Sequence, residues 1–175
     1  MLAAALLGAG CATRLNTVPV SLMTRSESRF LAAVGTLMDT GDLTQQAAVE
    51  GAIGAPLALS REQPAMFGAA RYYRPAPGSL AARAGVVWES VTLDGSPPRP
   101  TRVASLEISS LEPLVCVDER AVAQRFPGHA IDDTASAVTV YSGPGQEGEF
   151  YVRFTKGTGE RCFVTATLVQ NSSRS

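Results

Sequence analysis

Residues 148–169 read GEFYVRFTKGTGERCFVTATLV, two segments of alternating apolar side chains on either side of a glycine-rich turn. The turn, Gly157-Thr158-Gly159, has the composition of a β-hairpin connection. A third alternating segment, residues 137–142, comes before Gly143-Pro144-Gly145, a second turn of this kind. The C-terminal part of the chain therefore predicts three neighbouring antiparallel strands, at 137–142, 148–156 and 161–169.

Upstream of these strands, ERAVAQRF at 119–126 predicts a short helix, with Asp118 as its N-cap and Pro127-Gly128 as its stop. Further upstream, residues 67–74, 84–93 and 101–112 predict strands, and Pro113 ends the last of them. The element order of this region is three strands followed by a helix and three more strands.

Two helices are expected before the first strand. Thr24 and Glu27 have the spacing of a capping box, and apolar residues then recur at helical spacing as far as Met38. Asp42 or Thr44 can cap a second helix, which Gly54 and Pro56 end. The predicted class is α+β, with short helices packed on an antiparallel sheet in two halves, ααβββ at 24–112 and αβββ at 113–175, that form one compact unit.

Alternation also predicts which side chains face outward. It places Cys162, Val164, Ala166 and Leu168 on the core face of the last strand. The outer face of the C-terminal strands then carries Tyr141, Tyr151, Arg153 and Phe163. Aromatic residues and arginine are enriched in protein-binding hot spots, so these four are the candidate binding residues. The alternative is a second core, covered by the loop at 95–100 or by the other half of the chain.

One segment carries a family resemblance. Residues 42–56, DLTQQAAVEGAIGAP, resemble the helical motif of small outer-membrane assembly lipoproteins of the SmpA/OmlA type, which β-lactamase-inhibitor-protein-like domains share. The resemblance implies a protein without catalytic activity that binds other proteins through its sheet.

The first residues, MLAAALLGAGC, form an apolar run that is too short to span a bilayer and ends in small residues before Cys11. This arrangement resembles the lipobox of bacterial lipoproteins. The resemblance implies a signal peptide at 1–10, lipidation of Cys11, a tether at 11–23 and a location on the periplasmic face of the outer membrane. The alternative is a buried N-terminal helix that contains a cysteine.

Cys116 and Cys162 remain as an even pair, and in an oxidising compartment such a pair is expected to form a disulfide. With one histidine and no CxxC motif, the sequence does not predict a zinc site.

Signals for catalysis and for nucleic-acid binding are weak. The net charge of −1 argues against a nucleic-acid partner. His129 lies in a Pro-Gly-His loop, where a solvated side chain is expected, and no Gly-x-Ser-x-Gly elbow or phosphate loop occurs. We therefore expect no cofactor and no enzymatic activity. Two functions remain: a lipoprotein that binds and neutralises another protein, as an immunity protein or enzyme inhibitor does, or an accessory lipoprotein of an envelope assembly complex.

Overall fold

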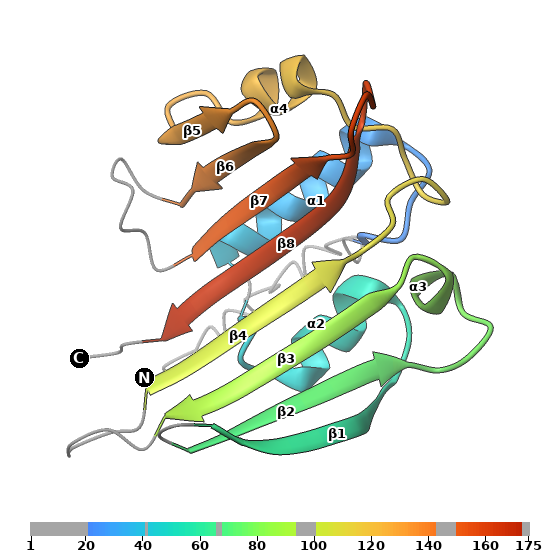
Figure 1. Ribbon diagram of the computed structural model, residues 1–175, viewed down its shortest axis with the longest axis vertical. Coiled ribbons are helices and arrows are strands. Elements are labelled where there is room, and N and C mark those ends of the chain that lie inside the picture. Colours follow the sequence, from blue (N-terminus) through green and yellow to red (C-terminus); the bar gives the residue numbers. More distant parts are fainter. Residues whose placement is uncertain (1–20, 41, 66–67, 94–100, 143–149, 173–175) are drawn as a thin grey trace, which may run out of the picture.

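A computed structural model describes residues 21–40, 42–65, 68–93, 101–142 and 150–172 (Figure 1). These residues form a mixed α+β fold, which confirms the predicted class. Its helices are α1 (Glu27–Thr40), α2 (Gln46–Ile53), α3 (Leu80–Arg83) and α4 (Glu119–Arg125). Its strands are β1 (Leu57–Ala65), β2 (Gly68–Pro75), β3 (Val86–Leu93), β4 (Thr101–Ile108), β5 (Ile131–Thr134), β6 (Ala137–Tyr141), β7 (Phe150–Lys156) and β8 (Phe163–Ser172).

All of these strands belong to one antiparallel sheet in the order β1-β2-β3-β4-β8-β7-β6-β5. Each half of the chain contributes four consecutive strands, and the two halves join where β4 pairs with β8. Figure 1 shows α1 and α2 behind the sheet, α1 across β7 and β8 and α2 across the strands of the first half. The fold therefore has two layers, with α1 and α2 on the same face of the sheet.

The core lies between these two layers. One row of directly opposed residues crosses the whole sheet on the helix side, and its central members, from Trp88 to Val140, are at most 3% exposed. At the two edges the row ends in Leu59 and Ile131, which are 52% and 38% exposed. The complete row is Leu59, Tyr73, Trp88, Leu106, Leu168, Val152, Val140 and Ile131. The helices thus cover the middle of the sheet better than its edges.

The turn between α1 and α2 is fastened to the sheet by the backbone of Leu43. Its N–H donates to Oε1 of Gln170 on β8 at 2.6 Å, and its carbonyl accepts from Nε1 of Trp88 on β3 at 2.9 Å. Leu43 is itself fully buried. Both polar groups of a buried backbone unit are therefore satisfied by side chains of the sheet.

The helix ends differ from the sequence-based predictions in two places. Glu27 does not close a capping box with Thr24; its carboxylate instead accepts a hydrogen bond from the N–H of Asp118. Helix α2 has Gln45 as its N-cap, while Asp42 accepts hydrogen bonds from the N–H and hydroxyl of Thr44 in the preceding turn. The predicted stop at Gly54 is confirmed, because this residue adopts the left-handed conformation with φ of 61°.

The last three residues of the predicted tether, 21–23, belong to the folded domain. Residues 1–20, with Cys11, lie outside the described part of the chain. Leu22 is fully buried, and its N–H donates to the carbonyl oxygen of Ala52 at 2.8 Å. The chain therefore enters the folded domain on the helix side of the sheet, at the end of α2.

Each half contains one strand more than predicted. The additional strands are β1 and β5, which form the two edges of the sheet. The predicted strand at 84–93 begins at Val86, after the short helix α3, and the predicted strand at 101–112 ends at Ile108. Edge strands pair on one side only and bury few side chains, which is why neither β1 nor β5 has a regular apolar pattern.

Candidate functional site

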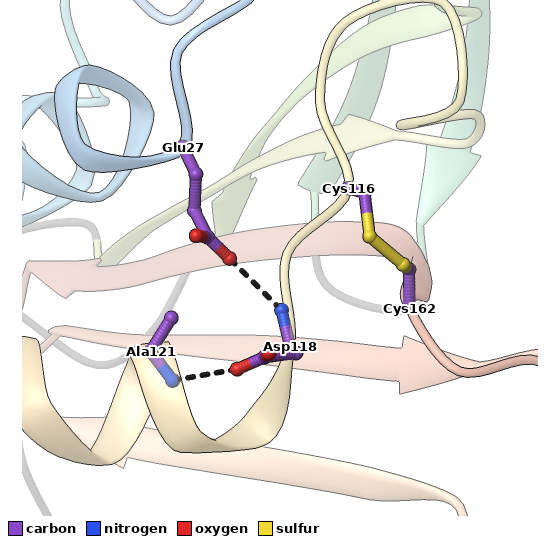
Figure 2. The surroundings of a disulfide bond; sticks show 5 residues. All are labelled: Glu27, Cys116, Asp118, Ala121 and Cys162. Carbon is purple, nitrogen blue, oxygen red and sulfur yellow. Dashed lines mark hydrogen bonds between the residues drawn. A yellow bond between two sulfur atoms is a disulfide. The ribbon is translucent and has the colours of Figure 1, made fainter.

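The predicted disulfide between Cys116 and Cys162 is present, with Cα atoms 5.3 Å apart (Figure 2). It joins the segment before α4 to the residue preceding β8. Val117, the next residue along, also forms a β-bridge with Phe163, whose N–H donates to the Val117 carbonyl at 2.9 Å. The segment before α4 is thus held to β8 by one covalent bond and one backbone hydrogen bond.

Asp118 connects this segment to both helices. Its carboxylate accepts from the N–H of Ala121 at 2.8 Å, which confirms it as the N-cap of α4. Its own N–H donates to Oε1 of Glu27 at 3.1 Å, at the start of α1, as Figure 2 shows. The starts of α1 and α4 are therefore held beside each other, next to the disulfide.

The sheet face opposite α1 and α2, which we call the open face, is the main candidate site. One row of opposed residues crosses seven strands on this face: Arg61, Tyr72, Glu89, Ser105, Val169, Tyr151 and Tyr141. A neighbouring row contains Val87, Glu107, Thr167, Arg153, Thr139 and Asp132. Val91 and Val103 are opposed in a third row. The valines and tyrosines of these rows are half-buried, so they expose apolar and aromatic surface.

Three of the four predicted binding residues lie on the open face. Tyr141 and Tyr151 are directly opposed, with ring centroids 6.0 Å apart, and Arg153 is exposed on the next row. Thr139, directly opposed to Arg153, is only 8% exposed. The two halves of the chain lie side by side in one sheet, so the other half does not stack over this face. The loop at 95–100, the other proposed cover, lies outside the described residues.

The prediction for Phe163 is wrong. This side chain is 2% exposed and lies in the core, with its ring 5.5 Å from that of Phe154. The reason is a register shift beside Lys156, because Thr155 opposes Thr165 but Lys156 opposes Phe163. Val164 is the extra residue of the bulge, and it is half-buried rather than in the core. One inserted residue reverses the alternation and turns Phe163 inward.

The open face also includes residues that sequence reasoning did not assign. Tyr72 holds the guanidinium of Arg61 4.6 Å from its ring centroid and accepts a hydrogen bond from Gln63 at 2.9 Å. Glu107 and Arg153 are both exposed, and neither forms an ion pair with any residue in the described ranges. The sequence signal that could have identified Tyr72 and the valines of β3 is the period-2 alternation within residues 68–75 and 86–93.

A second candidate is an open pocket of about 500 Å³ on the opposite face, between α4, the edge strand β5 and the turn before β8. Its apolar lining comes from Ala123, Ile131 and Val138. Its charged lining is mixed: Asp118, Glu119, Asp133, Arg120, Lys156 and Arg161. None of these residues was predicted as a site, because they are far apart in the sequence and form no recognisable motif.

Electrostatic coupling in this pocket centres on Lys156. Its Nζ lies 2.6 Å from Oε2 of Glu119, and the hydrogen bond between them lowers the pKa of Glu119 and raises that of Lys156. Asp133 lies beside Glu119. Desolvation, and next the neighbouring Glu119, raise the pKa of Asp133. Two carboxyl groups therefore lie close to one ammonium group.

His129 packs against Phe126, at the C-terminal end of α4. It is half-buried rather than solvated as predicted, and its ring packs edge-on against Phe126 at 5.5 Å between centroids. Its Nδ1 is buried without a hydrogen-bond partner among the described residues. Among all the residues that the structure describes, no group of three or more His, Cys, Asp or Glu side chains is arranged to hold a metal ion.

Comparisons of this chain with protein families, with curated proteins and with solved structures found no match. Among the helices described, none is long and apolar enough to cross a membrane.

Proposed function

We propose that this protein acts by binding and neutralising another protein, as an immunity protein or enzyme inhibitor does, and that the open face of its sheet is the binding surface. The observation that carries this proposal is the composition of that face. Sheets with one solvated face typically alternate between apolar residues inside and polar residues outside. Here four half-buried valines and three half-buried tyrosines face away from α1 and α2: Val87, Val91, Val103, Val169, Tyr72, Tyr141 and Tyr151.

The chemistry of these side chains suits a protein partner. Tyrosines offer rigid amphipathic contact area at a small entropic cost. Arg153, beside them, can form a bidentate pair with a carboxylate of the partner, and Glu107 can receive a basic group. A surface with both charges and aromatic residues matches the composition of protein interfaces better than that of a nucleic-acid site.

The two sheet edges are less suited to binding. In β1 a register shift after Leu59 and the presence of Pro64 interrupt regular pairing with an added strand. In β5 the strand has only four residues, and two of them are aspartates. Natural proteins use such features to prevent edge-to-edge association, which favours the face of the sheet over its edges as the binding surface.

We further propose an envelope location with lipidated Cys11 as the anchor. The disulfide supports an oxidising compartment, because such bonds are rare in the cytosol. A Cys11→Ser variant should lose membrane association in cell fractionation. A wild-type protein that is soluble and carries no acyl chain would contradict the anchor.

The binding surface can be tested by photo-crosslinking in the producing bacterium. A photoreactive amino acid at Tyr151 or Tyr72 should give a specific crosslinked product, whereas one at Ala48, exposed on α2, should not. The partner identified by mass spectrometry is then titrated with purified wild type and Tyr151→Ala, for which we expect about tenfold weaker binding or more. The same affinity for both proteins would reject the open face. A secreted toxin or an enzyme as the partner supports neutralisation, and a component of an assembly machine supports the alternative function.

A further inference from the structure

The pocket between α4 and β5 lies where the helix layer leaves the sheet uncovered. In Figure 1, α4 lies beside β5 and β6 at the end of the sheet. All four residues of β5 are exposed, although Ile131 and Asp133 face the same side of the sheet as α1. This pocket is separate from the open face. Its two β5 residues, Ile131 and Asp133, point to the helix side of the sheet, whereas Asp132 between them points to the open face.

Part of the pocket lining is apolar. Ile131 is 38% exposed and is one of two large hydrophobic side chains that are exposed in the described ranges. It continues the core row that runs through Val140 and Val152, so it marks the point where the core reaches the surface. Ala123 and Val138 complete this apolar lining. The volume of about 500 Å³ is within the range of small-molecule sites.

The lining contains an acidic cluster around Lys156. Glu119 and Asp133 lie together, and Lys156 is paired with Glu119 through a 2.6 Å contact. Asp133 takes part in no ion pair with another described residue. A cationic group placed here would meet two carboxylates and one ammonium, so a second cation is electrostatically favoured.

The lining also contains two arginines, together with a third carboxylate, that of Asp118, which caps α4. Arg120 lies in the first turn of α4, and Arg161 lies in the turn before β8. Both are exposed, and within the part of the chain that is described neither forms an ion pair. Guanidinium groups bind carboxylates through two parallel hydrogen bonds, so these two arginines provide the donors for an anionic group.

We propose that this pocket binds a small zwitterion with an apolar side chain, namely an α-amino acid or a short peptide of the same chemistry. Its ammonium lies by Glu119 and Asp133, its carboxylate by Arg120 and Arg161, and its side chain over Ile131. A lining that contains apolar, acidic and basic side chains supplies a contact for each of these three parts of the ligand. The proposal is independent of the open face and of its protein partner.

Three isosteric probes test this proposal on the purified full-length protein with its disulfide intact. L-Leucine has all three parts, 4-methylpentanoate lacks the ammonium, and 3-methylbutylamine lacks the carboxylate. Each is titrated while the methyl resonances of Ile131 are followed by NMR. We expect L-leucine to shift these resonances and to bind about tenfold more tightly than either analogue. Comparing L-leucine with glycyl-L-leucine then distinguishes a free amino acid from a peptide as the ligand.

Matched variants locate the two charged contacts. Arg161→Gln should weaken the binding of L-leucine more than that of 3-methylbutylamine, which has no carboxylate. Asp133→Asn should weaken the binding of L-leucine more than that of 4-methylpentanoate, which has no ammonium. Arg29→Gln and Asp39→Asn, exposed on α1 outside the pocket, should leave binding unchanged. The proposal is overturned if L-leucine leaves Ile131 unshifted at about 20 mM, or if either analogue binds as tightly as L-leucine. The probe comparison on the wild type decides the matter even if a variant fails to fold.

Discussion

The indole Nε1 of Trp88 donates a buried hydrogen bond to the carbonyl oxygen of Leu43 at 2.9 Å, between residues 45 positions apart in the chain. This bond joins the turn between the two main helices to the centre of the sheet. Since the N–H of Leu43 is bound by Gln170 from the second half, the same turn contacts both halves of the fold. We expect this turn to be a point at which the helix layer and the sheet unfold together.

Replacing Trp88 by Phe should therefore destabilise the protein by about 2 kcal/mol or more, because a buried carbonyl loses its donor and part of the core is left unfilled. Urea denaturation followed by circular dichroism measures the change. Tyr72→Phe, which removes a hydroxyl on the open face, is the control and should cost less than about 1 kcal/mol. Equal effects of the two substitutions would show that the Leu43 contact contributes little.

Phe163→Ala and Tyr151→Ala should separate folding from binding. Phe163 is buried against Phe154, so its truncation should destabilise the fold by about 3–5 kcal/mol. Tyr151 is half-buried on the open face, and its truncation should cost about 1 kcal/mol or less. Thermal and urea unfolding of both variants provide the measurement. A Phe163→Ala variant as stable as wild type would argue against the inward orientation of this side chain.

The Cys116–Cys162 bond spans 46 positions, for which the chain-entropy model gives about 4 kcal/mol of stabilisation. A double Cys→Ser variant should melt at a clearly lower temperature than wild type. It should still fold, because the backbone pairing of Val117 with Phe163 holds the same segment. Thiol labelling without reductant is the companion measurement, and two reactive thiols in the native protein would contradict the disulfide.

Asp133→Asn should stabilise the protein at neutral pH. Desolvation and the neighbouring Glu119 raise the pKa of Asp133 above its ordinary value of 3.8, so the folded state disfavours the ionised form. The stability that protonated Asp133 contributes is fully present below pH 3.8. It is lost as the pH rises through the higher pKa that Asp133 has in the folded state. The melting temperature of the variant should therefore exceed that of wild type at pH 7, and the difference should disappear in strong acid. A difference of constant size across the pH range would indicate a cause other than ionisation.

Local sequence patterns were sufficient to predict the helices and strands that bury an apolar stripe or face. Helical spacing from Phe30 to Met38 and alternation in residues 150–154 each correspond to an element whose periodic residues are buried. Glycine and proline marked the stops, as at Gly54, because the left-handed conformation there follows from local backbone sterics. The α+β class and the cysteine pairing also followed from the sequence, the pairing by elimination since two cysteines remained after Cys11.

The tertiary structure decided the features that depend on pairing between distant segments. Strands β1 and β5 exist because a neighbouring strand satisfies their backbone groups, although their side chains have no apolar period. The joining of two half-sheets through β4 and β8 is a long-range pairing that no local pattern encodes. The orientation of Phe163 depends on a one-residue bulge against Lys156, and because side chains alternate with a period of two, that one residue moves it from the open face to the core.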